Sequence, residues 1–363
     1  MDWSTSGYLA LSALNVKNGY IDPSADAHYG DQELYNKWMS GKELYEGQVL
    51  FTTEAPMGNV AQVPDNNKYI LSQRTIAFDV NSDKITDDFL AVLLRSPKSF
   101  NELSSLASGG TAKGVSQKSL SQFKVTLPNN LEEQKKIGTF FKQLDTTIAL
   151  HQRKLGQLKR LKQGFLQGLF ANDTNVPKLR FAGFTEKWEQ RKLIDLVVKL
   201  NKSTNSSRLP KVEFEDIVAG EGRLNKDVSQ KFDNRKGIEF LPNDILYGKL
   251  RPYLKNWFKA TFTGVALGDF WVFRAKKSDS DFIYSLIQAD RYQKVANDTS
   301  GTKMPRSDWK KVSGTVFYIP NDLKEQQKIG SFFKQLDDTI ALHQNKISQL
   351  KKLKKAFLQK MFV

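Results

Sequence analysis

The feature that most constrains this chain is a long internal repeat. Residues 131–170 and 323–362 match at 28 of 40 positions without a gap. In both copies apolar residues recur in alternating steps of four and three, which is the 3.5-residue period of a coiled-coil seam. Two near-identical helices of this kind are each other's natural partners. The repeat therefore predicts two related halves and a pair of long antiparallel helices with pseudo-twofold symmetry.

The predicted seam occupies equivalent positions in the two copies. In the first copy it comprises Ile137, Phe141, Leu144, Ile148, His151, Leu155, Leu158, Lys162, Phe165 and Leu169. In the second copy it comprises Ile329, Phe333, Leu336, Ile340, His343, Ile347, Leu350, Lys354, Phe357 and Met361. The two lysines interrupt the apolar stripe, and we expect the neighbouring Leu161 and Leu353 to take over the contact by a local shift of the stripe.

Two of the three histidines lie at the middle of the predicted seams. In an antiparallel pair, positions mirror about the midpoint, so we expect His151 and His343 to meet near the pseudo-twofold axis. A metal or catalytic role is the alternative, but His28 is the only other histidine and no carboxylate recurs beside the pair at ligand spacing. Structural packing is the favoured interpretation.

Both helices begin with a recognisable start signal. Asn130 with Glu133, and Asp322 with Glu325, have the spacing of a capping box shortly after a proline. Residues 133–135, Glu-Gln-Lys, also resemble the end of a nuclease metal site, but the second copy has Glu-Gln-Gln at 325–327 and lacks the lysine. Helix capping explains the two glutamates better than metal binding does.

The rest of the chain has short β-branched and aromatic runs broken by Gly, Pro, Asn and Asp, which are typical of compact mixed modules. Leu50-Phe51 with Pro56 corresponds to Leu246-Tyr247 with Pro252, so the two modules are distantly related. We expect an α+β protein with these divisions: module one at 1–130, a helix at 131–170, a linker at 171–176, module two at 177–322 and a helix at 323–363. Near-identical helices with divergent modules suggest one scaffold that carries two different recognition surfaces.

Composition points to a polyanionic partner and away from catalysis. The chain has 55 Lys+Arg against 39 Asp+Glu, a net charge of +16, which favours nucleic acid. The sequence contains no cysteine, which excludes disulfides and thiolate chemistry, and it has no P-loop, dinucleotide loop or base-methylation motif. Residues 220–222, Gly-Glu-Gly, fit a turn. No secretion signal or membrane span is apparent, so we expect a cytoplasmic protein without a metal or cofactor.

Three motifs resemble the specificity subunits of type I restriction-modification systems. They are E-Q-x-K-I-G-x-F-F and L-x-x-L-K-x-x-F-L-Q, each present twice, and the module opening at 177–181, Pro-Lys-Leu-Arg-Phe, with Trp188. The resemblance implies two target recognition domains, separated by the antiparallel helices, that read the two halves of a split double-stranded DNA site. It also implies a non-catalytic subunit that docks two methyltransferase subunits, with nuclease-translocase subunits joining that core. A coiled-coil protein–protein adaptor without DNA specificity is the alternative.

The sequence departs from the family pattern at its start. In module two, 45 steps separate Pro177 from Gly222, whereas only 18 residues precede Gly19, its counterpart in module one. Module one is thus roughly 25–30 residues shorter than module two before this glycine. We expect a shortened first recognition domain, with its missing strand either absent or supplied from elsewhere.

Basic side chains interleaved with aromatic residues and tight turns mark the candidate DNA contacts. In module two they are Lys249, Arg251, Tyr253, Lys255, Thr302, Lys303 and Arg306, and in module one they are Thr111, Lys113, Gln117 and Lys118. Arg306 and Gln117 are the candidates for reading base edges, while the lysines would position the backbone. A buried aromatic cluster with a solvated basic edge is the alternative. Weaker candidates are Arg74, Arg223 and the basic run Lys351, Lys352, Lys354 and Lys355, which also fits a solvated helix face.

Overall fold

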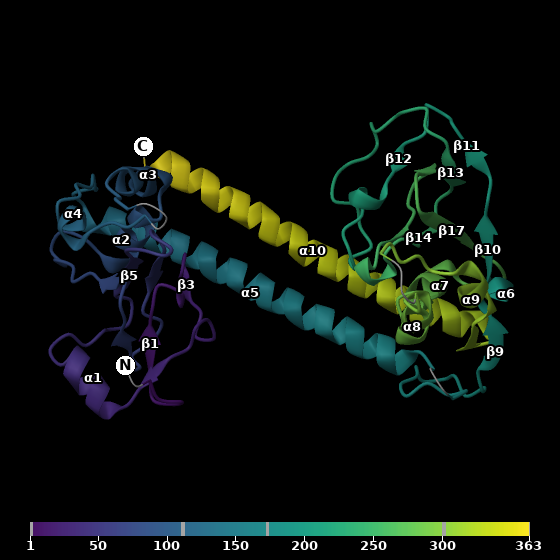
Figure 1. The fold of residues 1–363 in the computed structure, drawn as a ribbon, viewed down its shortest axis with the longest axis horizontal. Coiled ribbons are helices and arrows are strands. Elements are labelled where there is room, and N and C mark those ends of the chain that lie inside the picture. Colours follow the sequence, from purple (N-terminus) through teal and green to yellow (C-terminus); the bar gives the residue numbers. More distant parts are fainter. Residues whose placement is uncertain (1–2, 110–112, 172–173, 300–302, 363) are drawn as a thin grey trace. The chain divides into compact units, whose positions relative to one another are not determined.

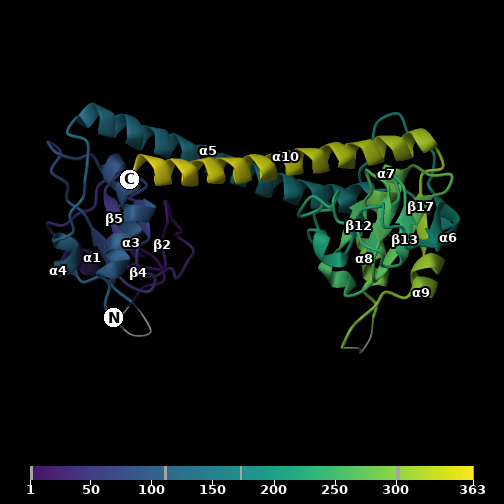
Figure 2. The same ribbon diagram turned by 90° about the horizontal axis from the view of Figure 1, so that it is seen from above.

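The computed structural model describes residues 3–109, 113–171, 174–299 and 303–362. The chain forms two compact units, unit 1 from Met1–Arg153 with Asn345–Val363 and unit 2 from Lys154–Gln344. Two 39-residue helices, α5 (Leu131–Leu169) and α10 (Leu323–Met361), each contribute one part to each unit. Both are continuous in the two views of the ribbon (Figures 1 and 2). Among the described residues, no helix combines the length and apolar character needed to cross a bilayer.

Unit 1 contains module one, which is built on small sheets. Their strand orders are β4-β1-β7, β6-β5-β8 and β2-β3. The strands are β1 (Tyr8–Leu11), β2 (Val16–Lys17), β3 (Tyr20–Ile21), β4 (Tyr29–Gly30), β5 (Val49–Thr52), β6 (Val60–Gln62), β7 (Ile70–Leu71) and β8 (Thr75–Ala77). The helices are α1 (Gln32–Met39), α2 (Asp87–Leu94), α3 (Pro97–Ser105) and α4 (Gln117–Ser121). Strand β5 is buried along its whole length and packs with α2 and α3 in the largest core cluster of this unit.

Unit 2 contains module two, whose sheets are larger. The strand orders are β10-β17-β14-β15, β11-β13-β16-β12 and β18-β9. The strands are β9 (Glu189–Lys192), β10 (Val197–Leu200), β11 (Ser203–Thr204), β12 (Lys211–Val212), β13 (Gly237–Phe240), β14 (Ile245–Gly248), β15 (Trp257–Lys259), β16 (Gly264–Ala266), β17 (Phe270–Ala275) and β18 (Val316–Ile319). The helical elements are α6 (Leu193–Leu196), η1 (Phe214–Asp216), η2 (Pro252–Leu254), α7 (Ser280–Leu286), α8 (Asp290–Ala296) and α9 (Trp309–Gly314). Aromatic residues fill much of the core.

The weak sequence correspondence between the modules is a true structural repeat. In unit 1, Leu50 of β5 lies opposite Ala61 of β6 and Ala77 of β8. In unit 2, its counterpart Leu246 of β14 lies opposite Phe258 of β15 and Val272 of β17. Each central strand is therefore flanked in the same way by two antiparallel neighbours. The predicted α+β architecture with an internal repeat is confirmed.

The long helices pack against each other antiparallel within each unit, and the contacts repeat. In unit 1 the rings of Phe140 and Phe357 lie 5.1 Å apart, and in unit 2 their repeat equivalents Phe332 and Phe165 lie 4.8 Å apart. Of the 20 predicted seam positions ten are buried and nine are half-buried, among them Ile137, His151 and His343, while Met361 at the end of α10 is 42% exposed. His151 belongs to unit 1 and His343 to unit 2, and their meeting at a pseudo-twofold axis stays a prediction.

The expected shift of the seam at its two lysines is wrong. Leu161 and Leu353 are 49% and 45% exposed, so they do not replace the lysines in the interface. Instead Lys162 donates to Asp337 at 2.6 Å in unit 2, and Lys354 pairs with Asp145 in unit 1. The lysines stay in the stripe because a carboxylate from the facing helix neutralises each of them.

The helix starts are capped, but the expected capping boxes do not form. The Asn130 side chain accepts a hydrogen bond from the Glu132 amide at 2.8 Å, and Asp322 does the same for Lys324. The glutamates at 133 and 325 do not reach back to these caps. Glu325 is occupied elsewhere, because it is buried against Arg180. The prediction of helix starts holds while the assigned role of the two glutamates fails.

The glutamine after each of these glutamates joins the helix to its module. Gln134 accepts from the Thr86 amide at 3.1 Å and donates to the Lys84 and Pro128 carbonyls. Its equivalent Gln326 accepts from the Asp279 amide at 3.1 Å and donates to the carbonyl of Pro320. Both amides are buried. Each side chain fills both hydrogen-bonding roles at the start of a long helix, which fixes the helix against the module.

Candidate nucleic-acid interface

In unit 2 the two candidate loops of module two form one continuous surface. The Arg251 amide donates to the Pro305 carbonyl at 2.7 Å, and the Ser307 amide donates to the Lys249 carbonyl at 2.8 Å. Leu250 and Arg306 form an isolated antiparallel bridge between these bonds. Residues 249–255 and 303–307 are therefore held together by backbone pairing, and we call them the basic surface of unit 2.

A carboxylate orders the cations of this surface. Asp269 lies 3.6 Å from the Lys249 ammonium and 3.1 Å from the Arg306 guanidinium, with both cations partly exposed. The hydrogen bond from Arg306 is the main cause that lowers the pKa of Asp269. Arg251, Lys255 and Lys303 of the same surface are also exposed. The surface therefore carries an excess of positive charge, and Asp269 holds two of its side chains in place. Such a surface suits contact with phosphates.

The turn within this surface exposes an aromatic ring. Arg251 and Lys255 have left-handed backbones, with φ of 46° and 56°, on either side of the short helix η2. Between them Tyr253 is 57% exposed, and Met304 from the second loop is 50% exposed. Aromatic residues, methionine and arginine are the side-chain types that are enriched at protein interfaces. By contrast, Tyr247 is buried in the core, where burial raises its pKa, so the buried aromatic cluster and the basic surface are successive parts of one segment.

Arg223, a weaker candidate, is engaged in an ion pair. Its guanidinium lies 2.7 Å from Glu221, and the same carboxylate accepts from Lys159 at 2.8 Å. The Gly220 amide donates to the carbonyl of Lys255, so this turn abuts the basic surface. Gly220 and Gly222 both have positive φ, in agreement with the predicted turn. Arg223 is thus less available than Arg251 for contact with an anion.

Unit 1 repeats the backbone of this surface without its charges. The Val115 amide donates to the Thr53 carbonyl at 3.0 Å, and Glu54 forms a bridge with Gly114. Ala55 has the left-handed φ of 48° that Arg251 has in unit 2. The positions of Lys249, Arg251 and Arg306 are accordingly occupied by Thr53, Ala55 and Gly114. The two units present different chemistry on the same backbone framework.

Unit 1 places cations elsewhere around this loop pair. The Arg74 carbonyl accepts from the Thr53 amide at 2.8 Å, as the Asp269 carbonyl accepts from Lys249 in unit 2, so Arg74 stands where unit 2 has an aspartate. The Arg74 side chain lies 3.5 Å from Glu54 and remains half-exposed. Arg74 is a weak candidate from sequence alone, because a positive charge does not indicate where the residue lies in the fold. Lys113, Gln117 and Lys118 are exposed, with Gln117 at the first position of α4.

Some of the remaining candidates lie on the long helix α10, and others lie outside the described residues. Thr111 and Thr302 are outside the described part of the chain, while Lys303 is exposed. On α10, Lys351, Lys352 and Lys355 are exposed, whereas Lys354 is half-buried in its ion pair with Asp145. The basic run is thus a solvated face with one lysine withdrawn into the helix pair. No group of three or more potential metal ligands is found among the described residues.

A family model and curated relatives match this chain. The model described as type I restriction modification DNA specificity domain matches residues 16–160 and 185–352. The MjaIX specificity subunit of a type I restriction enzyme from Methanocaldococcus jannaschii is 22% identical over 341 residues, which cover 87% of this chain and 77% of that protein. The MjaVIII specificity subunit from the same organism is 32% identical over 112 residues, which cover 31% of this chain and only 26% of that protein.

Solved structures share the fold. The S subunit of a type I restriction-modification system from M. genitalium superposes with a TM-score of 0.66 at 14% identity, covering 99% of this chain and 90% of that chain. A chain from a structure described as showing complex assembly and conformational transition of the type I R-M system gives a TM-score of 0.50 at 16% identity, covering 98% of this chain and 91% of that chain.

Proposed function

Because this chain belongs to the family of type I restriction-modification DNA specificity domains, we propose that it reads a bipartite double-stranded DNA site, one half-site with each unit. The observation that carries this proposal is the repeated loop pair. One backbone framework occurs in both units and bears Lys249, Arg251 and Arg306 in unit 2, but Thr53, Ala55 and Gly114 in unit 1. A shared framework with different side chains suits two half-sites of different sequence.

The roles of the side chains follow from their chemistry. Lys249, Lys255 and Lys303 would contact phosphates, which position the protein without reading sequence. Arg306 and Arg251 present planar guanidinium groups that suit the O6 and N7 acceptors of guanine in the major groove. Tyr253 would pack against the sugar-phosphate edge or a base. In unit 1, Lys113 and Lys118 would contact the backbone and Gln117 would read an adenine.

The chemistry on DNA would come from partner subunits. Specificity subunits of this family are in general non-catalytic. We propose that the chain works without a cofactor and assembles with two methyltransferase subunits, which the nuclease-translocase subunits join. A coiled-coil adaptor without DNA specificity is the alternative, and membership of a DNA specificity family disfavours it.

The assembly is tested by co-expressing the chain with its cognate methyltransferase subunit. Light scattering after size exclusion is expected to give one specificity chain with two methyltransferase subunits, and the complex is expected to select split-site DNA from genomic fragments. Its affinity should fall steeply as salt rises, because phosphate contacts release counterions. A lone chain whose binding is insensitive to salt would support the adaptor instead.

Two substitutions on the basic surface separate positioning from reading. Lys249→Ala is expected to weaken binding equally on all sequences and to reduce the salt slope by about 1. Arg306→Ala is expected to cost about 1–3 kcal/mol on the cognate site and to relax selectivity at one base position. Titrations at several salt concentrations on cognate and single-mismatch duplexes measure both effects.

The control is Lys202→Ala, which removes a side chain that is 78% exposed and belongs to neither loop. It should leave both affinity and selectivity unchanged. Equal losses for all three variants would mean that net charge, rather than the basic surface, governs binding.

A further inference from the structure

In unit 2 a tight turn, residues 218–223, lies between the basic surface and the two long helices. The turn is closed by a hydrogen bond from the Val218 amide to the Arg223 carbonyl at 2.9 Å. On one side, the Gly220 amide donates to the carbonyl of Lys255 at 2.9 Å. The turn is therefore joined by its backbone to the loop 249–255 of the basic surface.

On the other side, one carboxylate joins the turn to the helices. Glu221 accepts hydrogen bonds from Lys159 of α5 and from Arg223 within the turn, both at 2.8 Å. Burial acts to raise the pKa of Glu221, but Lys159, Arg223 and a hydrogen bond from Gln344 of α10 outweigh it and lower the pKa. The Glu221 side chain is only 18% exposed, so solvent and salt screen these contacts less than they would on an open surface. Glu221 thus contacts side chains from both long helices.

Gly222 allows the turn to lie close against the core of the unit. A Cβ atom at this position would lie 1.9 Å from the Tyr284 hydroxyl of α7 and 3.5 Å from the Trp257 indole of β15. The backbone of Gly222 is also left-handed, with φ of 67°, which glycine adopts without steric cost. Trp257 follows Lys255 by two positions and is buried in the core. Core, loop and helices together therefore fix the position of this turn.

Unit 1 repeats this arrangement without the carboxylate. Asn18 stands where unit 2 has Glu221, while Lys351 and Gln152 are the repeat equivalents of the two helix residues that bind Glu221. Asn18, Gln152 and Lys351 line a hollow of 480 Å³, and all three are exposed. Within the described part of the chain, Lys351 forms no ion pair. The helix side chains thus recur in both units, whereas the carboxylate between them and the turn occurs in unit 2.

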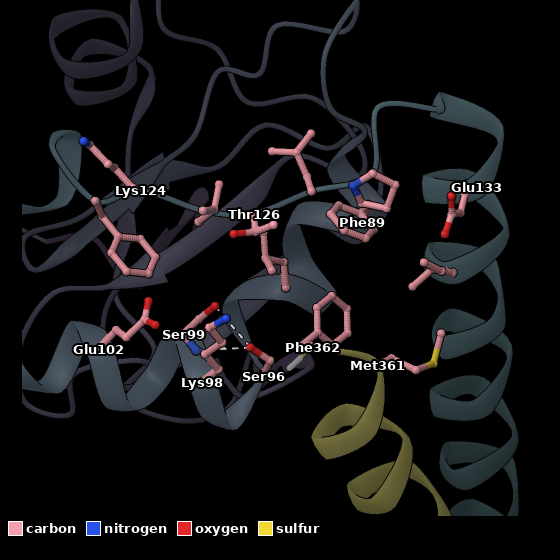
Figure 3. Close-up of a pocket in the computed structure, with 16 residues that line it drawn as sticks. Phe89, Ser96, Lys98, Ser99, Glu102, Lys124, Thr126, Glu133, Met361 and Phe362 are labelled. Carbon is pink, nitrogen blue, oxygen red and sulfur yellow. Dashed lines mark hydrogen bonds between the residues drawn. The ribbon is translucent and has the colours of Figure 1, made fainter.

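The hollow at the turn of unit 1 is distinct from the hollow that Figure 3 shows. The latter lies around Phe89, Lys98, Glu102 and Lys124, near the start of α5 and the end of α10. The two hollows share no lining residue. The hollow in Figure 3 is therefore no part of the attachment between the turn and the helices.

We propose that Glu221 is a positioning residue for DNA reading, which fixes the basic surface relative to the long helices and makes binding sensitive to the distance between the two half-sites. This role rests on the proposed function. One base pair added to the spacer of a bipartite site moves one half-site by about 3.4 Å and rotates it by about 35° relative to the other. A loop that is fixed to the helices resists following this movement, whereas a loop released from them follows part of it. Glu221 acts through the loop and does not itself contact DNA.

The test uses the complex with the methyltransferase subunit and a bipartite site selected from random duplexes. Binding is measured on that site, on sites whose spacer is one base pair longer or shorter, and on single-mismatch sites. Glu221→Gln is expected to reduce the discrimination against altered spacers about tenfold, the effect of one hydrogen bond to a charged group, and to leave the discrimination against mismatches unchanged. Lys159→Met should have the same effect with the fold intact, because the lysine side chain is 46% exposed. The double variant should add no further loss, since both substitutions remove the same contact.

Lys351→Met is the matched control, because it removes the same charge from the equivalent position of unit 1, where Asn18 replaces the glutamate. Its discrimination against altered spacers should equal that of the parent. Parental discrimination in both Glu221→Gln and Lys159→Met would overturn the proposal, and so would an equal loss in Lys351→Met. A parallel loss of mismatch discrimination would also overturn it, because the carboxylate would then only support the folding of the loop. A parent complex that selects no bipartite site would contradict the proposed function itself, and this role with it.

Discussion

Replacing Glu325 by glutamine is expected to lower the free energy of unfolding of unit 2 by about 3 kcal/mol. Glu325 is buried and takes three hydrogen bonds from Arg180 and Trp188. The carboxylate raises the pKa of Arg180 through these bonds, so its loss strands a guanidinium that is only 15% exposed. Removing one partner of a buried pair costs more than the pair contributes, because the remaining charge is neither hydrated nor neutralised.

The repeat supplies a matched control for this substitution. Glu133→Gln makes the same chemical change at the equivalent position of unit 1, where the side chain is exposed. Its effect should lie within about 0.5 kcal/mol, as for an ordinary surface position. Native-state hydrogen exchange resolves the two units, since amides of β14 report on unit 2 and amides of β5 on unit 1. Equal destabilisation by the two substitutions would refute the role assigned to Glu325.

The long helices could be predicted from sequence because their pattern is local and occurs twice. A 3.5-residue period over 39 residues leaves little choice of secondary structure. The interactions of polar residues within the seam were missed, although the repeat held a signal. Asp145 and Lys162 of the first copy recur as Asp337 and Lys354, and antiparallel pairing brings each aspartate to the lysine of the other copy. Gln134 and Gln326 are likewise identical while the next residues differ.

The candidate interface was predictable in composition but not in geometry. Residues 249–255 and 303–307 are rich in cations and were named from sequence, but their joining depends on backbone bonds across more than fifty residues. The left-handed backbone of Arg251 also has no sequence signal, because glycine is the usual residue there. The aspartate that orders Lys249 and Arg306 comes from a third segment. Such non-local contacts are set by tertiary packing rather than by pattern.

The differences between the units are concentrated where the framework meets its surroundings. Helix contacts, glutamine hydrogen bonds and central strands recur in both units, while the side chains of the loop pair differ. This distribution suits a scaffold that holds its own geometry constant and lets recognition vary. It also means that one unit serves as the internal control for a substitution in the other.

The ion pairs in the helix seam can be compared between the two units in this way. In unit 1 Asp145 binds two cations, Lys354 and Arg95, the latter at 2.7 Å and only 7% exposed. In unit 2 its equivalent Asp337 binds Lys162, and Gln288 stands where unit 1 has Arg95. Asp145→Asn is therefore expected to cost about 3 kcal/mol, because it leaves two neighbouring cations without their carboxylate.

Lys354→Met should cost much less, about 1 kcal/mol or under, because Arg95 still neutralises Asp145 and the new side chain is apolar. Burial, reinforced by Arg95, lowers the pKa of Lys354 below its ordinary value of 10.5. The unfolded chain then binds more protons than the folded chain between the two pKa values, so this lysine makes stability rise with pH in that alkaline window. Hydrogen exchange and urea unfolding across that range should show the rise in the parent and its loss in Lys354→Met.

The equivalent substitutions in unit 2 test whether the costs in unit 1 are unequal because two cations share Asp145. Asp337→Asn and Lys162→Met each leave one buried charge without its partner, so their costs should be similar, unlike the unequal costs in unit 1. Burial raises the pKa of Asp337, which makes its unpaired charge in Lys162→Met costly at neutral pH. If Asp145→Asn proved no more harmful than Lys354→Met, the second cation would not depend on Asp145, and the two seams would be electrostatically alike despite the arginine.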